Sequence, residues 1–169
     1  MKNKKYANRG MQLEKKIDKA NKEYLKGEGI QRTYVASIHK IPTPVQITKD
    51  NGKSITGFKK RGELVDYIGT LLGGHAIAFD AKETKGKSLP LANIHESQFK
   101  FLETWFNYGA TTFLIVHFSG EDKYYRLDFK TLSAYWKGAL NGSRKSIPIS
   151  AFENELIYQN GILYYLEGL

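Results

Sequence analysis

The sequence predicts a single mixed α/β domain from which a basic arm protrudes. Segments with the apolar spacing of helices alternate along the chain with runs of β-branched and aromatic residues. The length of 169 residues and a hydrophobic content of 41% fit one globular domain over residues 1–169. One lysine-rich segment has few large apolar side chains, so it is expected to stand outside the core.

The N-terminal part is expected to form a helix and then a strand. The helix is predicted over residues 9–26, because apolar side chains recur there on one helical face: Leu13, Ile17, Ala20 and Tyr24. Residues 32–38 are rich in β-forming residues and predict a strand. Pro42 and Pro44 then fix an extended passage, because proline also restricts the residue before it.

The arm is predicted over residues 45–62. Two short β-rich segments, 45–48 and 54–58, flank an Asn51-Gly52 pair, which suits the tight turn of a hairpin. Its basic side chains are Lys49, Lys53, Lys59, Lys60 and Arg61. Because the hairpin offers little to a core, we expect it to project from the body.

The remaining elements predict a central sheet flanked by helices. Strands over 64–72 and 75–84 are expected to join through Gly73-Gly74, and an apolar, β-branched run over 111–118 predicts a buried central strand. A helix is predicted over 93–108. The later elements are a strand over 124–129, a helix over 131–140, a loop over 141–146 and a strand over 162–166.

Charge is concentrated in the N-terminal third. Residues 1–62 hold 16 Lys and Arg against five Asp and Glu, whereas the rest of the chain is slightly acidic. This asymmetry favours a polyanionic partner such as nucleic acid, although a solvated basic face and a membrane surface stay open on charge alone. The chain has no cysteine, which excludes thiolate metal sites and cysteine nucleophiles. No apolar run is long enough to span a bilayer, so we expect a cytoplasmic protein without a membrane partner.

Candidate catalytic residues lie on the predicted strand 75–84. Side chains alternate along a strand, so Asp80 and Lys82 share one face, roughly 6.6 Å apart. Asp66 would reach the same place if the preceding strand pairs through the two glycines. Two carboxylates and a lysine at one sheet end suit phosphodiester hydrolysis with Mg²⁺, a hard cation that prefers oxygen ligands. The alternative is a solvated pair of opposite charges on an exposed face.

An Asp followed by (D/E)-x-K is typical of the restriction-endonuclease-like, or PD-(D/E)xK, nuclease core, a mixed central sheet flanked by helices. The chain also resembles the RecU-type Holliday-junction resolvases of bacteria and their phages. The similarity rests on five segments in order: NRGMQLE (8–14), HKIPTPVQI (39–47), VDYIG (65–69), FDAKET (79–84) and PLANIHESQ (90–98). It implies a homodimeric, Mg²⁺-dependent endonuclease, with Mn²⁺ as a substitute ion, that cuts four-way DNA junctions by paired symmetric nicks. It further implies modulation of a RecA-type recombinase and a nucleoid-associated location.

The resemblance assigns roles residue by residue. Asp66 matches the metal-binding aspartate, Asp80 stands where the family usually has glutamate, and Lys82 matches the lysine that stabilises the transition state. Gln98 matches a glutamine that completes the metal site, and Val65 replaces a threonine ligand. The chain begins close to the first matched segment, so a leading extension is expected to be missing.

Two of these residues can also be interpreted from the sequence itself. Gln98 lies on the apolar stripe of its predicted helix, so its amide needs a partner, either the metal site or a neighbouring strand. Glu14 flanks the stripe of the first helix; it would orient a catalytic group or, equally, form a surface ion pair.

DNA contacts are predicted for the arm and for the two matched segments before it. Two arms of a dimer would enter the open centre of a junction, and their basic groups would contact phosphates without reading bases. The candidate residues are Arg9, Lys40, Lys49, Lys53, Lys59, Lys60 and Arg61. Two other functions stay open: a nuclease of the same fold acting on another DNA target, and a non-catalytic DNA-binding accessory of recombination.

Overall fold

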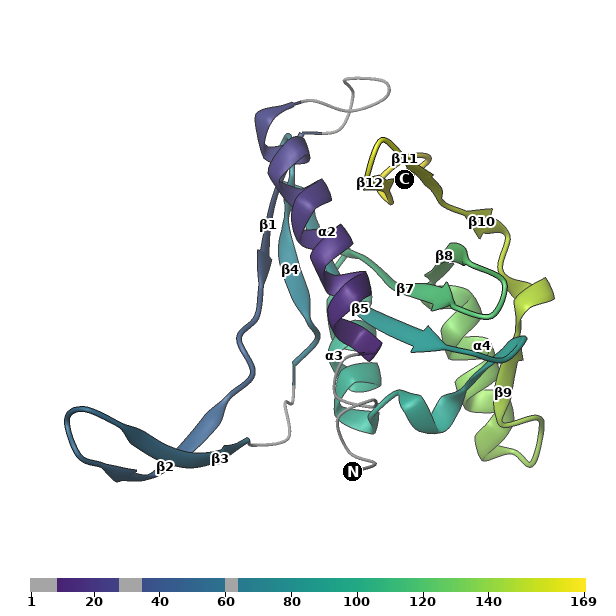
Figure 1. Ribbon diagram of the computed structural model, residues 1–169. Helices are drawn as coiled ribbons and strands as arrows, with labels where there is room; N and C mark the ends of the chain where they lie inside the picture. The colour runs from purple at the N-terminus through teal and green to yellow at the C-terminus, as the bar shows by residue number, and fades with distance from the viewer. Residues whose placement is uncertain (1–8, 28–34, 60–63) are drawn as a thin grey trace.

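The computed structural model describes residues 9–27, 35–59 and 64–169. Its centre is a six-stranded mixed sheet with the strand order β1-β4-β5-β7-β8-β10 (Figure 1). The strands are β1 (Ala36–Lys40), β4 (Tyr67–Leu71), β5 (Ala76–Thr84), β7 (Thr111–Phe118), β8 (Lys123–Asp128) and β10 (Asn154–Glu155). Only β5 and β7 run parallel within this sheet; its other neighbours are antiparallel.

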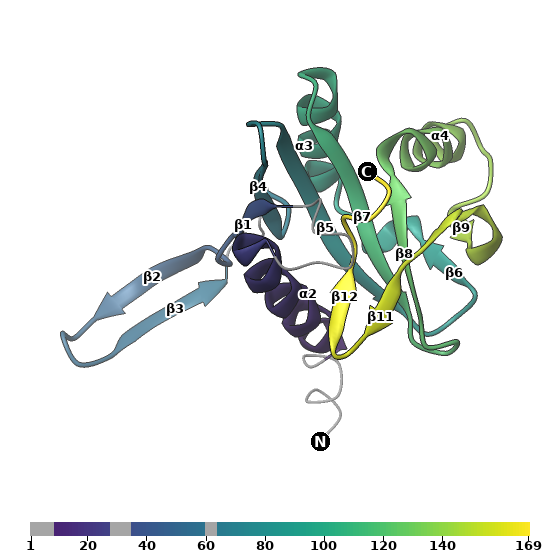
Figure 2. The ribbon, with the colours of Figure 1, turned by 90° about the horizontal axis from the view of Figure 1, so that it is seen from above.

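Helices cover both faces of the sheet. Helix α2 (Arg9–Lys26) lies on one face, and α3 (Glu96–Asn107) and α4 (Phe129–Leu140) lie on the other (Figure 2). Side chains alternate along β5, so this strand contributes to the hydrophobic core on both faces of the sheet. Ile77 and Phe79 pack with α2, whereas Ala78 packs on the side of α3 and α4. Strand β7 is buried along almost its whole length, as predicted for a central strand.

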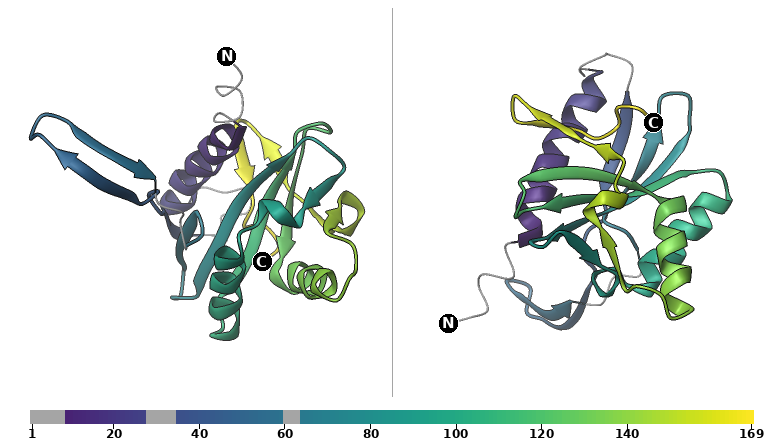
Figure 3. Two further views of the ribbon diagram at one scale, coloured as in Figure 1. Left: turned by 90° about the horizontal axis from the view of Figure 1, so that it is seen from below. Right: turned by 90° about the vertical axis from the view of Figure 1, so that its right-hand side faces the viewer.

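The arm is a separate two-stranded sheet of β2 (Val45–Asp50) and β3 (Ile55–Lys59), which projects away from the body (Figures 1 and 3). The Asn51 N–H donates to the Ser54 carbonyl, so the turn centres on Gly52-Lys53, one residue later than predicted. Both predicted basic side chains that are described here, Lys49 and Lys53, are exposed.

The arm is less purely basic than the sequence analysis implied. Four large apolar side chains on the arm are at least half exposed: Val45, Ile47, Ile55 and Phe58. The side chains of Arg9 and Lys59, and the whole of Lys60 and Arg61, lie outside the described residues, so the predictions for them stay predictions.

Several element boundaries differ from the sequence prediction. Strand β1 continues to Lys40 because its register with β4 runs as far as the Lys40–Tyr67 pair. Strand β4 starts only at Tyr67, and a 3₁₀ turn over Leu91–Asn93 precedes α3. Helix α4 begins two residues earlier than expected, at Phe129.

The remaining elements are short pairs. Strand β6 (Ser88–Pro90) pairs with β9 (Ser146–Pro148), so the predicted loop ends at residue 145. A second 3₁₀ turn spans Ile149–Ala151. Strand β11 (Ile157–Gln159) pairs with β12 (Ile162–Tyr164), which ends two residues before the predicted strand. Within the described parts of the chain, no helix is both long and apolar enough to cross a membrane.

Candidate active site

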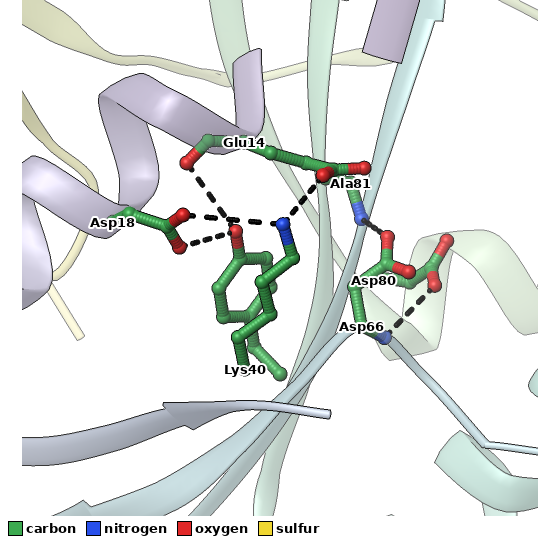
Figure 4. Close-up of polar contacts among 7 residues, drawn as sticks. Glu14, Asp18, Lys40, Asp66, Asp80 and Ala81 are labelled. Carbon is green, nitrogen blue, oxygen red and sulfur yellow. Dashed lines mark hydrogen bonds and ion pairs between the residues drawn. The ribbon is translucent and has the colours of Figure 1, made fainter. Parts of the chain in front are cut away.

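Asp66 and Asp80 are brought together by the pairing of β4 with β5. The register places Tyr67 opposite Phe79, so Asp66, which directly precedes β4, lies beside Asp80. The Asp66 N–H donates to Asp80 Oδ1 at 3.2 Å, and the Ala81 N–H donates to Asp66 Oδ2 at 3.0 Å (Figure 4). Each aspartate is therefore held by the backbone of the other strand.

Gln98 connects Asp80 with Lys82. Its Nε2 donates to Asp80 Oδ1 at 2.9 Å, and its Oε1 accepts a hydrogen bond from Lys82 Nζ at 3.0 Å. The same Oε1 accepts the His95 N–H at 3.2 Å, which fixes the amide at the first turn of α3. Lys82 Nζ lies 2.5 Å from Asp80 Oδ2. The structure thus gathers Asp66, Asp80, Lys82 and Gln98 into one polar group.

Asp80 lies in an environment that disfavours its charged form. Its side chain is 0% exposed, and burial raises its pKa from 3.8 to about 7. The Lys82 ammonium acts in the opposite direction, and the Asp66 carboxylate adds to the rise. Among the described residues, none donates a hydrogen bond of good geometry to Asp80 Oδ2, although this oxygen is ion-paired with Lys82. A divalent cation beside it would favour the ionised carboxylate.

A pocket of about 240 Å³ opens next to this group. It is lined by Asp66 and Gln98, by His95, by residues 41–44 at the root of the arm, and by Leu64 and Val65. Val65 itself is 2% exposed, so its side chain contributes to the core, and any contribution to a metal would come from its backbone. Asp66 therefore borders a pocket on the side of the body from which the arm leaves.

The donor set suits a hard divalent cation. Asp66 and Asp80 offer carboxylate oxygens, and no nitrogen or sulfur ligand is among them, which fits Mg²⁺ better than zinc. Within the described residues, no cluster of three or more His or acidic side chains has the geometry of a complete metal site. Asp66 lines the pocket, whereas Asp80 is 0% exposed and its Oδ2 is ion-paired with Lys82. An ion shared by the two aspartates would therefore take the place of Lys82 Nζ at Asp80 Oδ2. The predicted role of Gln98 as a ligand stays a prediction, because its oxygen here accepts two hydrogen bonds.

Glu14 and Lys40 form a second polar group beside Asp66. Lys40 Nζ lies 2.6 Å from Glu14 Oε2 and 3.9 Å from Asp18 Oδ2 (Figure 4). The Tyr67 hydroxyl donates to Asp18 Oδ1 at 2.8 Å. Burial would lower the pKa of Lys40, but its hydrogen bond and charge interaction with Glu14 outweigh this, so the pKa is raised. Lys40, predicted to contact phosphate, is paired with carboxylates of α2 in this arrangement.

Asp18 and Tyr67 were not singled out from the sequence. Asp18 follows Glu14 by one helical turn, and Tyr67 follows Asp66, so both adjoin residues that the motifs marked. Neither has a motif of its own, since their contact joins α2 to β4 across 49 residues.

The family model described as Recombination protein U (RecU) matches residues 8–169. The chain belongs to the RecU family. A protein of Oceanobacillus iheyensis named Holliday junction resolvase RecU is 39% identical, and the alignment covers 90% of this chain and 78% of the relative. A RecU of the same name from Pediococcus pentosaceus is 38% identical, with 97% and 84% covered. The family resemblance inferred from the five segments is thereby confirmed.

A solved structure is also similar to this RecU chain. It is that of Hjc from Archaeoglobus fulgidus, described as a Holliday junction resolvase, with a TM-score of 0.49 and 11% sequence identity. The alignment covers 82% of this chain and 90% of that one.

Proposed function

We propose that this RecU chain is a metal-dependent endonuclease that resolves four-way DNA junctions in recombination and repair. The observation that carries the proposal is the convergence of Asp66, Asp80 and Lys82 beside the middle of β5, next to a pocket that Asp66 and Gln98 line. The RecU relatives are named for the same activity, which supports the choice of substrate.

The residues of the chain would divide the chemistry among them. The backbone bonds between Asp66 and β5 fix the two carboxylates relative to each other before substrate arrives. Gln98 holds both Asp80 and Lys82, so it acts as a positioning residue. The Lys82 ammonium, which Gln98 and Asp80 hold in place, would stabilise the negative charge that develops on the phosphate.

Mg²⁺ is the ion we propose for the site, with Mn²⁺ as a substitute. When bound by Asp66 and Asp80, it would polarise the scissile phosphate and lower the pKa of a bound water. Asp80 is one methylene shorter than the glutamate usual in the family, which places its carboxylate close to the backbone of Asp66.

Junction recognition would come from the arm and from a dimer. A two-fold dimer matches the two-fold symmetry of a four-way junction and supplies two active centres for paired nicks. The arm leaves the body directly beside the pocket, since residues 41–44 line the pocket and lead into β2. A RecA-type recombinase as partner and a nucleoid-associated, cytoplasmic location belong to the same proposal.

The test is incubation of purified protein with a labelled synthetic four-way junction, with and without Mg²⁺. We expect symmetric nicks only with the ion. Asp66→Ala and Lys82→Ala should each abolish cleavage while junction binding persists, because neither residue lies on the arm. Loss of binding in step with cleavage would contradict the assigned roles.

The same assay separates the other candidates. Equal cleavage of linear duplex and junction would indicate a nuclease with another DNA target. Binding without any Mg²⁺-dependent scission would indicate a non-catalytic accessory protein. Neutralising Lys49 and Lys53 on the arm should reduce the binding preference for junction over duplex. An unchanged preference would exclude the arm as the element that recognises the junction.

A further inference from the structure

Helix α2 carries a lysine stripe that the catalytic centre does not use. Lys15, Lys19, Lys22 and Lys26 are spaced four, three and four residues apart, so they lie along one side of the helix. All four are exposed. The buried side of α2 carries Leu13, Ile17, Ala20 and Tyr24, which lie roughly opposite the stripe. The lysine stripe therefore lies on the side of α2 that faces away from the buried contacts of this helix with the sheet.

The acidic side chains of α2 do not neutralise this stripe. Glu14 is held by Lys40, and Asp18 is held by Tyr67 and Lys40 on the side that faces the catalytic centre. Glu23 pairs with Lys26 at 3.4 Å, and this is the one ion pair recorded for the stripe among the described residues. Lys19 Nζ lies close to Gly161, at the turn between β11 and β12. Among the described residues Lys15 and Lys22 form no ion pair, so their ammonium groups can reach an outside partner.

The stripe continues toward the arm through a groove. The groove, of about 380 Å³, lies between α2 and β1, and Lys22 forms part of its α2 wall. Ser37, His39 and Lys40 line the β1 side, while Asp18 within it is already engaged. Because β1 leads into the arm through residues 41–44, the groove connects Lys22 on the outer side of α2 with the root of the arm, where Lys40 is paired with Glu14 and Asp18.

We propose that the lysine stripe of α2 binds the phosphate backbone of a duplex arm of the junction, as a DNA contact surface separate from the hairpin arm. The stripe is about 16 Å long at 1.5 Å per residue, which matches about five base pairs of duplex. Its partner is inferred from charge complementarity and from continuity with the arm root, and the inference rests on the proposed function. Lysines on a straight helix contact phosphates without reading bases.

The experiment compares three triple variants with the wild-type protein. In the first, Lys15, Lys19 and Lys22 are changed to Gln. In the second, the same three are changed to Arg, which keeps the charge. The third is a matched control on the opposite face of the sheet, with Lys100, Lys130 and Lys137, all exposed, changed to Gln. Affinity for a long-armed four-way junction and for plain duplex is measured over a range of salt, without Mg²⁺ so that nothing is cut.

Loss of three phosphate contacts should reduce the slope of log affinity against log salt by about 2.7. From 50 to 200 mM salt, the factor by which affinity falls should therefore be about 40 times smaller for the Gln variant of the stripe than for the wild type. The reduction should be equal for junction and duplex, since α2 would not sense the branch. The Arg variant should keep the wild-type slope. The slope of the control variant should differ from that of the wild type far less than the slope of the Gln variant of the stripe does.

An unchanged slope in the Gln variant would overturn the inference and leave the stripe as a solvated surface or a site for an acidic protein. An equal loss in the control variant would also overturn it, because the effect would then reflect net charge alone. Failure of the proposed function gives a different result. The wild type would then bind the junction no better than duplex, and the salt slope measured on duplex would still test the stripe.

Discussion

The buried carboxyl of Asp80 should make stability fall as pH rises. Burial raises its pKa to about 7 in the folded protein, whereas the unfolded chain has the ordinary value near 3.8. Between these values the folded state binds more protons than the unfolded state, so the free energy of unfolding decreases with pH. At a pH below both pKa values Asp80 causes no loss of stability, and at a pH above both the loss is complete.

The magnitude follows from the size of the shift. A rise of about three units corresponds to about 4 kcal/mol, of which about 3 kcal/mol is lost between pH 5 and pH 8. The side chain is fully buried, so screening by solvent does not reduce this figure.

The assay is denaturant unfolding at several pH values in EDTA, followed by the fluorescence of Trp105 and Trp136. The comparison protein is Asp80→Asn, which keeps an oxygen that accepts from Gln98 and from the backbone of Asp66 but cannot ionise. The contributions of the other titratable groups to the pH dependence of the unfolding free energy cancel when the two proteins are compared. We expect the wild type to lose about 3 kcal/mol relative to the variant from pH 5 to pH 8.

Parallel pH profiles of the two proteins would refute the reasoning. Should Asp80→Asn fail to fold, the carboxyl pKa of Asp80 can be read directly in the wild type from its ¹³C chemical shift. A midpoint near 4 would show that the low exposure of this group does not disfavour its charge.

Three other outcomes are expected. Mg²⁺ at a hundredfold excess over its Kd should raise the unfolding free energy at pH 8 by about 2.7 kcal/mol in the wild type but not in Asp80→Asn, measured by the same denaturant titration. Gln98→Ala should cost about 1–3 kcal/mol and slow single-turnover cleavage, because Asp80 loses a donor; unaltered stability and rate would argue against the bridging role. Gly69→Ala should cost about 1–3 kcal/mol in thermal or denaturant unfolding, because an added Cβ would lie 2.2 Å from the Ser37 carbonyl oxygen, whereas Gly86→Ala in open space should be neutral.

Local periodicity determined much of the fold. The spacing of Leu13, Ile17 and Tyr24 predicted both the bounds of α2 and its buried face, because each helical turn is set by nearby residues. The alternation that predicted a shared face for Asp80 and Lys82 also places Ile77 and Phe79 on the face opposite Ala78, as the structure has them. Boundaries such as the start of β4 were less predictable, since they depend on where a partner strand ends.

The site was predictable in its residue types but not in its contacts. The spacing of Asp80 and Lys82 was fixed by one strand. The position of Asp66 required the β4–β5 register, and the bridging by Gln98 required α3 to pack against β5. The pairing of Glu14 with Lys40 joins residues 26 apart in the sequence, and no local pattern reports such a contact.

The sequence by itself determined which side chains carry charge, which faces of the helices and strands are apolar, and which family motifs the chain contains. These properties depend on residue order within a few positions. Only the tertiary structure decided that Asp80 is sealed from water, that Lys40 is held by Glu14, and that the lysines of α2 point outward beside a groove leading to the arm. Desolvation and pairing depend on neighbours brought from distant segments, and those neighbours are chosen by the packing of the whole chain.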